Sequence, residues 1–234
     1  PKNRHCGGSL SASIGCFAMP EELAGATGTS NGGSICSVRV TRSQSQLRLA
    51  SEQLGISTFL PSGRRRALLI GICYKGQGKI ELEGCVHDIQ FMHYLLCTKF
   101  DFQLSDFVVM TDKDESLPSF MRGAKMPTRE NIIAAMKDLL ADAQPGDSLF
   151  FHFCGHGGQV KDKGCDEIDG LDETILPCDF ETAGEIIDDE LNQILVYNMP
   201  SGARLTALLD CCHSGTGFDL PHMYEASLIK EHGA

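Results

Sequence analysis

The chain has 234 residues, of which 42% are hydrophobic, so it can form one α/β domain with an extension, or two small domains. Its formal net charge of −11 argues against nucleic-acid binding and favours cationic partners, such as metal ions or basic peptides. No apolar run reaches about 18 residues and no charged-then-apolar leader opens the sequence, so we expect neither a membrane span nor a secretory signal. The eleven cysteines are scattered through apolar segments, which favours a reducing, cytoplasmic compartment, with organelle import of a longer precursor still open.

Residues 1–62 differ in composition from the rest of the chain. They are rich in Ser, Gly and Ala, including GATGTSNGGS at 25–34, and show little periodicity. We interpret them as a low-complexity N-terminal extension or regulatory arm. Cys6, Cys16 and Cys36 lack the paired CxxC spacing of a zinc module, which argues against a metal site in this arm.

From residue 63 onward, buried strands alternate with amphipathic helices. Nearly continuous apolar runs predict strands at 66–74, 106–111, 146–153 and 204–210. Helical spacing predicts helices at 84–100, at 128–143 with Thr128 as N-cap, and at 188–197, and a short hairpin is expected around 172–179. The alternation indicates an α/β fold with a mostly parallel sheet flanked by helices. In such sheets the reacting groups gather at the carboxyl ends of the strands.

Two of these strands lead directly into motifs with reactive side chains. The strand 146–153 continues into FCGHGG (153–158), and the strand 204–210 continues into DCCHSG (210–215). If the strands are neighbours, His156 and a cysteine of the second motif face each other across one cleft, and the glycines let the backbone turn. A thiol, an imidazole and nearby backbone N–H groups are what nucleophilic catalysis needs.

The second motif offers two candidate nucleophiles. Cys211 continues the strand and should point into the packing, whereas Cys212 falls at the turn, where its sulfur can reach the cleft. We therefore expect Cys212 to be the nucleophile, with N–H groups of Cys212 and Gly157 holding the oxyanion. No Asp or Asn that would orient His156 is evident, so the pair would act as a dyad. The alternatives are a histidine with a purely structural hydrogen bond, and a zinc site of His156, Cys211, Cys212 and His213, disfavoured because adjacent cysteines rarely reach one ion.

In these motifs and their order the chain resembles the metacaspases, relatives of caspases, gingipains and legumains. HFCGHGGQ and ALLDCCHSG look like the His and Cys motifs of that family, and RRALLIGICY, LEGCVHDI, MPTRENI and QPGD also resemble it. The resemblance covers roughly residues 64–224 and implies a caspase-like fold, with 63–234 as the large catalytic subunit. It also implies a small subunit, which we do not find in 63–234 and expect as a partner from the same precursor.

Two aspartates could select a basic side chain beside the nucleophile. Asp210 precedes the cysteine pair and Asp88 follows the first strand, so both fall at the carboxyl edge of the sheet, although each alone is also typical of a helix N-terminus or a strand end. The resemblance implies that they hold the Arg or Lys before the scissile bond, aided by a cysteine matching Cys85. Cys154 stands where metacaspases usually have Ser, and its thiol is a weaker hydrogen-bond donor. No basic pocket is visible, which argues against cleavage after aspartate.

The stretch 162–190 is dense in acidic residues. Such a run is typical of a solvated loop, but also of calcium binding between separate segments, because its spacing is not that of an EF-hand. The resemblance implies that calcium binds Asp172, Asp188, Asp189 and Asp219. Asp188 is also a plausible helix N-cap. Calcium would draw the loop after Cys212 toward the acidic stretch and so complete the substrate cleft.

We therefore expect a calcium-dependent cysteine endopeptidase that cleaves basic peptides and proteins after Arg or Lys. Arg64, Arg65, Arg66 and Lys230 are candidate self-cleavage sites. Two alternatives stay open. One is a non-catalytic, calcium-responsive regulatory or binding module on the same fold, and the other is a catalytic subunit that is inactive without its partner subunit.

Overall fold

The computed structural model describes residues 35–37, 62–161, 170–212 and 217–218. Its central sheet has five strands in the order β1-β8-β4-β2-β3. Their bounds are Ile35–Ser37 for β1, Arg65–Gly71 for β2, Phe107–Thr111 for β3, Ser148–Cys154 for β4 and Arg204–Asp210 for β8. Strands β8, β4, β2 and β3 are parallel to their neighbours, and only β1 is antiparallel. The prediction of a mostly parallel sheet is therefore confirmed.

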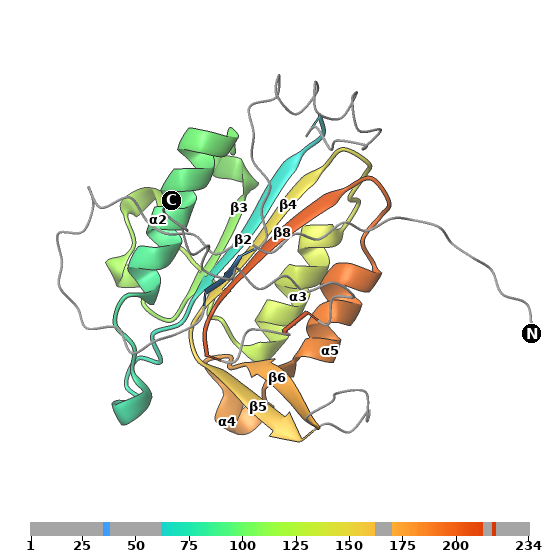
Figure 1. The fold of residues 1–234 in the computed structure, drawn as a ribbon. Helices are drawn as coiled ribbons and strands as arrows, with labels where there is room; N and C mark the ends of the chain where they lie inside the picture. Colours follow the sequence, from blue (N-terminus) through green and yellow to red (C-terminus); the bar gives the residue numbers. More distant parts are fainter. Residues whose placement is uncertain (1–34, 38–61, 162–169, 213–216, 219–234) are drawn as a thin grey trace, which may run out of the picture.

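Helices cover both faces of this sheet (Figure 1). Helix α2 (Cys85–Phe100) lies on one face, and helices α3 (Arg129–Leu140) and α5 (Asp188–Leu191) lie on the other, α5 continuing into the π-helical turn η6 (Asn192–Tyr197). Helix α3 begins as predicted, because the Thr128 side chain accepts a hydrogen bond from the N–H of Asn131. The short helical turns are η2 (Gly78–Ile80), η3 (Leu104–Asp106), η4 (Asp114–Ser116), η5 (Ser119–Met121) and α4 (Phe180–Ala183).

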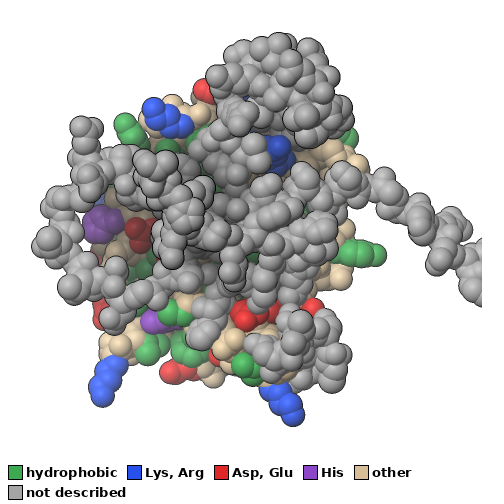
Figure 2. Space-filling view, viewed as in Figure 1, with side chains coloured by type: hydrophobic (Ala, Val, Ile, Leu, Met, Phe, Trp, Pro, Cys, Tyr) green, Lys and Arg blue, Asp and Glu red, His purple; other side chains and the backbone are tan. Residues whose placement is uncertain are grey.

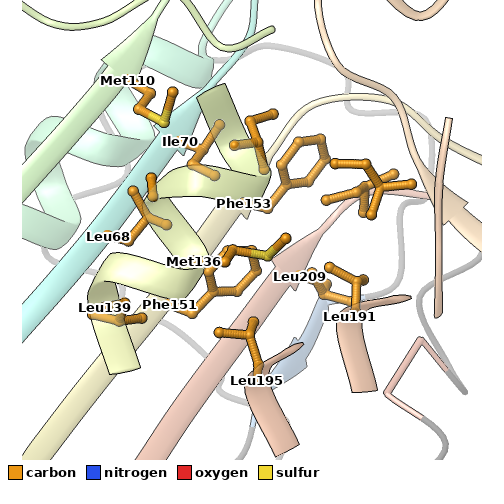
Figure 3. Packing of buried hydrophobic residues seen from close by; sticks show 14 of the residues in the cluster. Leu68, Ile70, Met110, Met136, Leu139, Phe151, Phe153, Leu191, Leu195 and Leu209 are labelled. Atoms are coloured by element: carbon orange, nitrogen blue, oxygen red, sulfur yellow. The ribbon is translucent and has the colours of Figure 1, made fainter. Parts of the chain in front are cut away.

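Strand β2 has its apolar run because it is buried on both faces. Successive side chains of a strand point to opposite faces. Leu68 and Ile70 therefore pack in the cluster beneath α3 and α5, while Leu69 packs in the cluster beneath α2. Phe151 and Phe153 of β4 join the first cluster and are fully buried (Figure 3). Two separate hydrophobic layers thus hold the central strands in place.

A second, smaller sheet continues from the carboxyl end of β4. It consists of β5 (Gly157–Lys161), β6 (Leu171–Ile175) and β7 (Ile186–Ile187), all antiparallel to their neighbours. The hairpin expected around 172–179 is wrong in its extent, since β6 pairs with β5, which begins with the last two glycines of the first motif. This pairing matters for function, because it attaches the glycines of the FCGHGG motif to a sheet.

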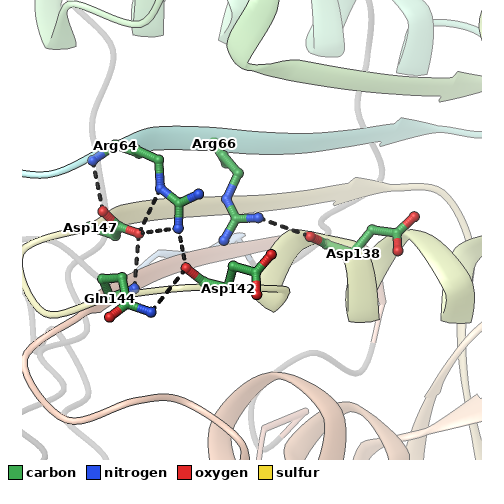
Figure 4. A network of polar contacts seen from close by, with 6 residues as sticks. All are labelled: Arg64, Arg66, Asp138, Asp142, Gln144 and Asp147. Atoms are coloured by element: carbon green, nitrogen blue, oxygen red, sulfur yellow. Dashed lines mark hydrogen bonds and ion pairs between the residues drawn. The ribbon is translucent and has the colours of Figure 1, made fainter.

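At the opposite end of the central strands, a polar network fixes the starts of β2 and β4 (Figure 4). The buried carboxylate of Asp147 accepts hydrogen bonds from the backbone N–H of Arg64 at 2.7 Å and of Gln144 at 3.0 Å, and it forms an ion pair with the Arg64 guanidinium at 3.1 Å. Burial alone would raise the pKa of Asp147, but these donors outweigh it and hold the pKa below its usual range. The network ties the strand entering the sheet to the loop before β4.

The arm predicted at residues 1–62 contributes β1, whose three residues pair with Leu208–Asp210 of β8, so it is not wholly without regular structure. The rest of the arm lies outside the described residues, and the division into arm and domain stays a prediction. Figure 2 shows basic and acidic side chains of the described residues scattered over the visible face. None of the helices in the described part of the chain has the length and apolar character needed to cross a membrane.

Candidate active site

The two predicted motifs meet where β4 and β8 end. Cys154 pairs in register with Asp210, and one step further the N–H of Gly155 donates to the carbonyl of Asp210 at 3.3 Å. Gly157 approaches the second motif so closely that a Cβ built on it would lie 2.0 Å from the carbonyl oxygen of Cys212. The sheet therefore brings the two loops into direct backbone contact, as the rule for parallel sheets anticipates.

His156 is half-buried between these loops and is oriented by a backbone group. Its Nε2 lies 2.8 Å from the carbonyl oxygen of Ile80, at the end of η2. A carbonyl oxygen can only accept, so Nε2 carries the proton and donates, which leaves the Nδ1 lone pair free to take a proton. The sequence shows no Asp or Asn that orients His156, and a backbone carbonyl in that role cannot be recognised from the sequence because every residue type has one.

Tyr74 is a second residue of the site that the sequence did not reveal. It is fully buried, and its hydroxyl accepts from the N–H of His156 at 2.9 Å and donates to the carbonyl of Leu176 at 2.7 Å. Its ring lies 4.7 Å from that of His156. Its φ of 53° is in the left-handed region, which is uncommon for a bulky residue. It is the last apolar residue of RALLIGICY, so the sequence pattern predicts only that it belongs to a buried strand.

The two adjacent cysteines have different surroundings. Cys211 is 6% exposed and belongs to the hydrophobic cluster beneath α3 and α5, whereas Cys212 is exposed. The sulfur of Cys211 is thus part of the packing, and that of Cys212 is accessible to a substrate. His213, a member of the alternative zinc site, lies outside the described residues.

The residues expected to bind the basic side chain lie at one edge of the central sheet, and we call them the acidic pocket: Cys85 and Asp88 in the first turn of α2, Cys154 at the end of β4, and Asp210 at the end of β8. The ligand atoms of Asp88, Cys154 and Asp210 all lie within 4.8 Å of one another. The Cys154 thiol is 3.3 Å from Asp88 Oδ2, to which it donates. Burial raises the pKa of Asp210, and the charge of Asp88 adds to the effect.

This geometry agrees with the comparison to known protein families. A family model described as metacaspase, peptidase C14 domain, matches residues 65–221. The chain belongs to the metacaspase family. Curated relatives named Metacaspase-1 include one from Schizosaccharomyces pombe, 47% identical over 178 residues that cover 73% of this chain and 40% of that protein. Another, from Candida glabrata, is 49% identical over 171 residues that cover 73% of this chain and 42% of that protein.

The metacaspase chain thus spans about 40% of the length of these curated relatives. Among solved structures, a crystal structure of protein GSU0716 from Geobacter sulfurreducens is 30% identical, with a TM-score of 0.46, and the match covers 66% of this chain and 52% of that one.

The residues expected to bind calcium lie apart from the acidic pocket, around β6 and the start of α5. Asp172 and Asp188 are buried, Asp189 is exposed, and Asp219 lies outside the described residues. Asp188 accepts from the N–H of Glu173 at 2.7 Å and of Asp189 at 2.8 Å. It is the first residue of α5 and not its N-cap, which is Ile187, so the capping role suggested for it is wrong.

Burial raises the pKa of Asp188 to about 6, and the neighbouring charges of Asp172 and Glu173 act in the same direction against its two N–H donors. The ligand atoms of the described acidic residues around β6 do not converge within 4.8 Å as those of the acidic pocket do.

Proposed function

We propose that this metacaspase chain is a cysteine endopeptidase that cleaves after Arg or Lys, with Cys212 as nucleophile and His156 as its base. The observation that carries the proposal is the convergence of two carboxylates, Asp88 and Asp210, beside an exposed thiol two residues further along the chain. A pocket with two carboxylates attracts a cationic side chain, and a guanidinium can bind both at once.

The chemistry follows from the orientation of His156. With Nε2 donating to Ile80, Nδ1 takes the thiol proton of Cys212, and the thiolate attacks the carbonyl carbon of the scissile bond. Backbone N–H groups of Gly157 and Cys212 stabilise the oxyanion. The tetrahedral intermediate collapses as His156 gives its proton to the leaving amine. Water then attacks the acyl-enzyme, His156 accepts its proton, and the Cys212 thiolate is released.

The acidic pocket supplies the specificity. Each charged hydrogen bond to a carboxylate contributes roughly 1.5–3 kcal/mol. Asp210→Asn should therefore lower kcat/KM for an Arg substrate by about 10- to 100-fold. The thiol of Cys154, already a donor to Asp88, would keep that carboxylate turned into the pocket.

We further propose that calcium binds near Asp172, Asp188 and Asp189, with Asp219 as a fourth ligand. The donors are all carboxylate oxygens, which suit a hard cation such as calcium. Burial of Asp172 and Asp188 and the raised pKa of Asp188 are consistent with a site that gains from a bound cation. Calcium would supply positive charge that holds the loop after Cys212 in place.

The outer edge of β8 supports the proposal of a partner subunit from the same precursor. Only Leu208–Asp210 pair with β1, so among the described residues Leu205–Ala207 have no strand beside them on that edge. An open strand edge is a template for a further strand. A small subunit that adds a strand there would extend the central sheet along the first half of β8.

The experiment is hydrolysis of fluorogenic peptides ending in Arg, Lys or Asp, with and without millimolar calcium, by the native chain, Cys212→Ala and the control Cys178→Ala. Calcium-dependent cleavage of the Arg and Lys peptides that is lost only in Cys212→Ala supports the proposal. Cleavage of the Asp peptide would refute the specificity. No turnover with calcium still bound would favour a regulatory module, and turnover restored by adding the remainder of the precursor would identify an incomplete enzyme.

A further inference from the structure

The acidic pocket has a donor set that the binding of a basic side chain does not require. Asp88, Cys154 and Asp210 come from three different elements, α2, β4 and β8, yet one ligand atom of each lies within 4.8 Å of the other two. The pocket thus contains a sulfur where two carboxylates already meet. Asp88 is exposed and Asp210 is half-buried, so the group opens to solvent on one side while Cys154 lies at its base.

A second sulfur adjoins the first. The thiol of Cys85, in the first turn of α2, lies near that of Cys154, but its sulfur is not one of the ligand atoms that lie within 4.8 Å of one another. Both cysteines are buried, at 4% and 5% exposure. One thiol and two carboxylates therefore converge, from β4, β8 and the covering helix α2.

The pocket carries excess negative charge that no described cation offsets. Among the ion pairs of the described residues, none involves Asp88 or Asp210. The thiol proton that Cys154 donates to Asp88 occupies the space between two potential ligands. A metal ion could replace this proton, since binding to thiolates releases protons.

The chemistry of the donors selects the kind of ion. Calcium and magnesium take oxygen ligands and have little affinity for sulfur. One sulfur and two carboxylate oxygens, with a water molecule as the fourth ligand, match the four-coordinate, tetrahedral preference of zinc. We propose that Asp88, Cys154 and Asp210 form a zinc site, so that Zn²⁺ and a basic side chain compete for the same pocket. The binding step does not depend on peptidase activity, and only the inhibition that it would cause depends on the proposed function.

The test measures metal binding by the full chain carrying Cys212→Ala and His156→Ala, which removes the catalytic pair as a competing metal site. Titration with Co²⁺ reports thiolate ligation through a sulfur-to-cobalt absorption band in the near ultraviolet, and Zn²⁺ should displace the cobalt. In that background Cys154→Ser should weaken zinc binding by at least about tenfold and reduce the sulfur band, because a ligand is lost. The control Cys178→Ser changes a half-buried cysteine outside the pocket and should have no effect.

A second variant keeps the test decisive if the Cys154→Ser chain does not fold. Asp88→Asn changes an exposed side chain and should also weaken zinc binding at least about tenfold. Arginine amide, as a probe for the basic side chain, should raise the apparent Kd for zinc in the inactive background. The proposal is overturned if no sulfur band appears, or if zinc binding is unchanged in both pocket variants.

With an active chain, zinc should raise KM for the Arg peptide without lowering kcat. If the chain has no peptidase activity at all, the cobalt and zinc titrations still decide the zinc site. Failure of the proposed function is thus distinguishable from failure of this inference.

Discussion

The Tyr74 hydroxyl is the support of His156 that can be tested most directly. Tyr74→Phe keeps the buried ring and its contact with the imidazole at 4.7 Å, and removes only the oxygen. That oxygen accepts from the N–H of His156 at 2.9 Å and donates to the carbonyl of Leu176 at 2.7 Å. The substitution therefore leaves two backbone groups without a partner in the interior.

Each unsatisfied buried polar group costs about 1–3 kcal/mol, so the free energy of unfolding should fall by about 2–6 kcal/mol. Because the N–H that fixes His156 is released, kcat should fall by about 10- to 100-fold while KM changes little. Urea denaturation, performed on the Cys212→Ala form to prevent self-cleavage, measures the first effect. Hydrolysis of the Arg peptide by the otherwise native chain measures the second.

Tyr197→Phe is the matched control, since Tyr197 is 76% exposed and its substitution should change the free energy of unfolding by less than about 0.5 kcal/mol. A Tyr74→Phe chain as stable and as active as the control would refute the positioning role. A chain that is destabilised but keeps full kcat at low temperature would show that the hydroxyl stabilises the fold without orienting the base.

Three further results are expected. In the peptide assay, Gly157→Ala should abolish turnover, because the new Cβ would lie 2.0 Å from the carbonyl oxygen of Cys212. Gly158→Ala is the control and should retain activity, because a Cβ at Gly158 meets only side-chain atoms at 3.0 Å or more. Asp147→Asn should lower the free energy of unfolding by about 2–4 kcal/mol in urea denaturation at pH 7, with the difference from the native chain shrinking as the pH falls through the lowered pKa of Asp147. Calcium affinity measured by calorimetry should fall about tenfold from pH 7 to pH 5, because Asp188, with its pKa raised to about 6, must lose its proton to bind the ion, and Asp188→Asn should remove this pH dependence.

Most of the central fold could be predicted because the burial of its strands and helices produces recognisable patterns of apolar residues in the sequence. The strand predicted at 204–210 agrees with β8 at both ends, and Thr128 caps α3 as its sequence context indicates. A parallel strand covered on both faces needs a continuous apolar run, and an amphipathic helix needs its 3.6-residue period. These patterns follow directly from which faces are removed from water.

The small sheet could not be predicted in the same way. Its strand β5 begins with Gly157 and Gly158, and glycine has a low β-propensity. In the sequence, β5 is separated from its partner β6 by residues 162–169, the first part of the acidic stretch. From the sequence, these glycines predict a turn that lets a ligand approach. They do make a close approach, but the partner is the backbone of Cys212, and the strand exists because β6 supplies the hydrogen bonds.

The groups that orient His156 were missed for a different reason: they act through the backbone or from within the core. The carbonyl of Ile80 could belong to any residue type, and only its distance of 2.8 Å from Nε2 gives it a role. Tyr74 lies three residues after Gly71, the last residue of β2. It is therefore in a loop, although the apolar residues of this loop continue the pattern of the strand. Its burial serves packing and its hydroxyl serves the site, which is why a substitution that spares the ring and removes the oxygen separates the two.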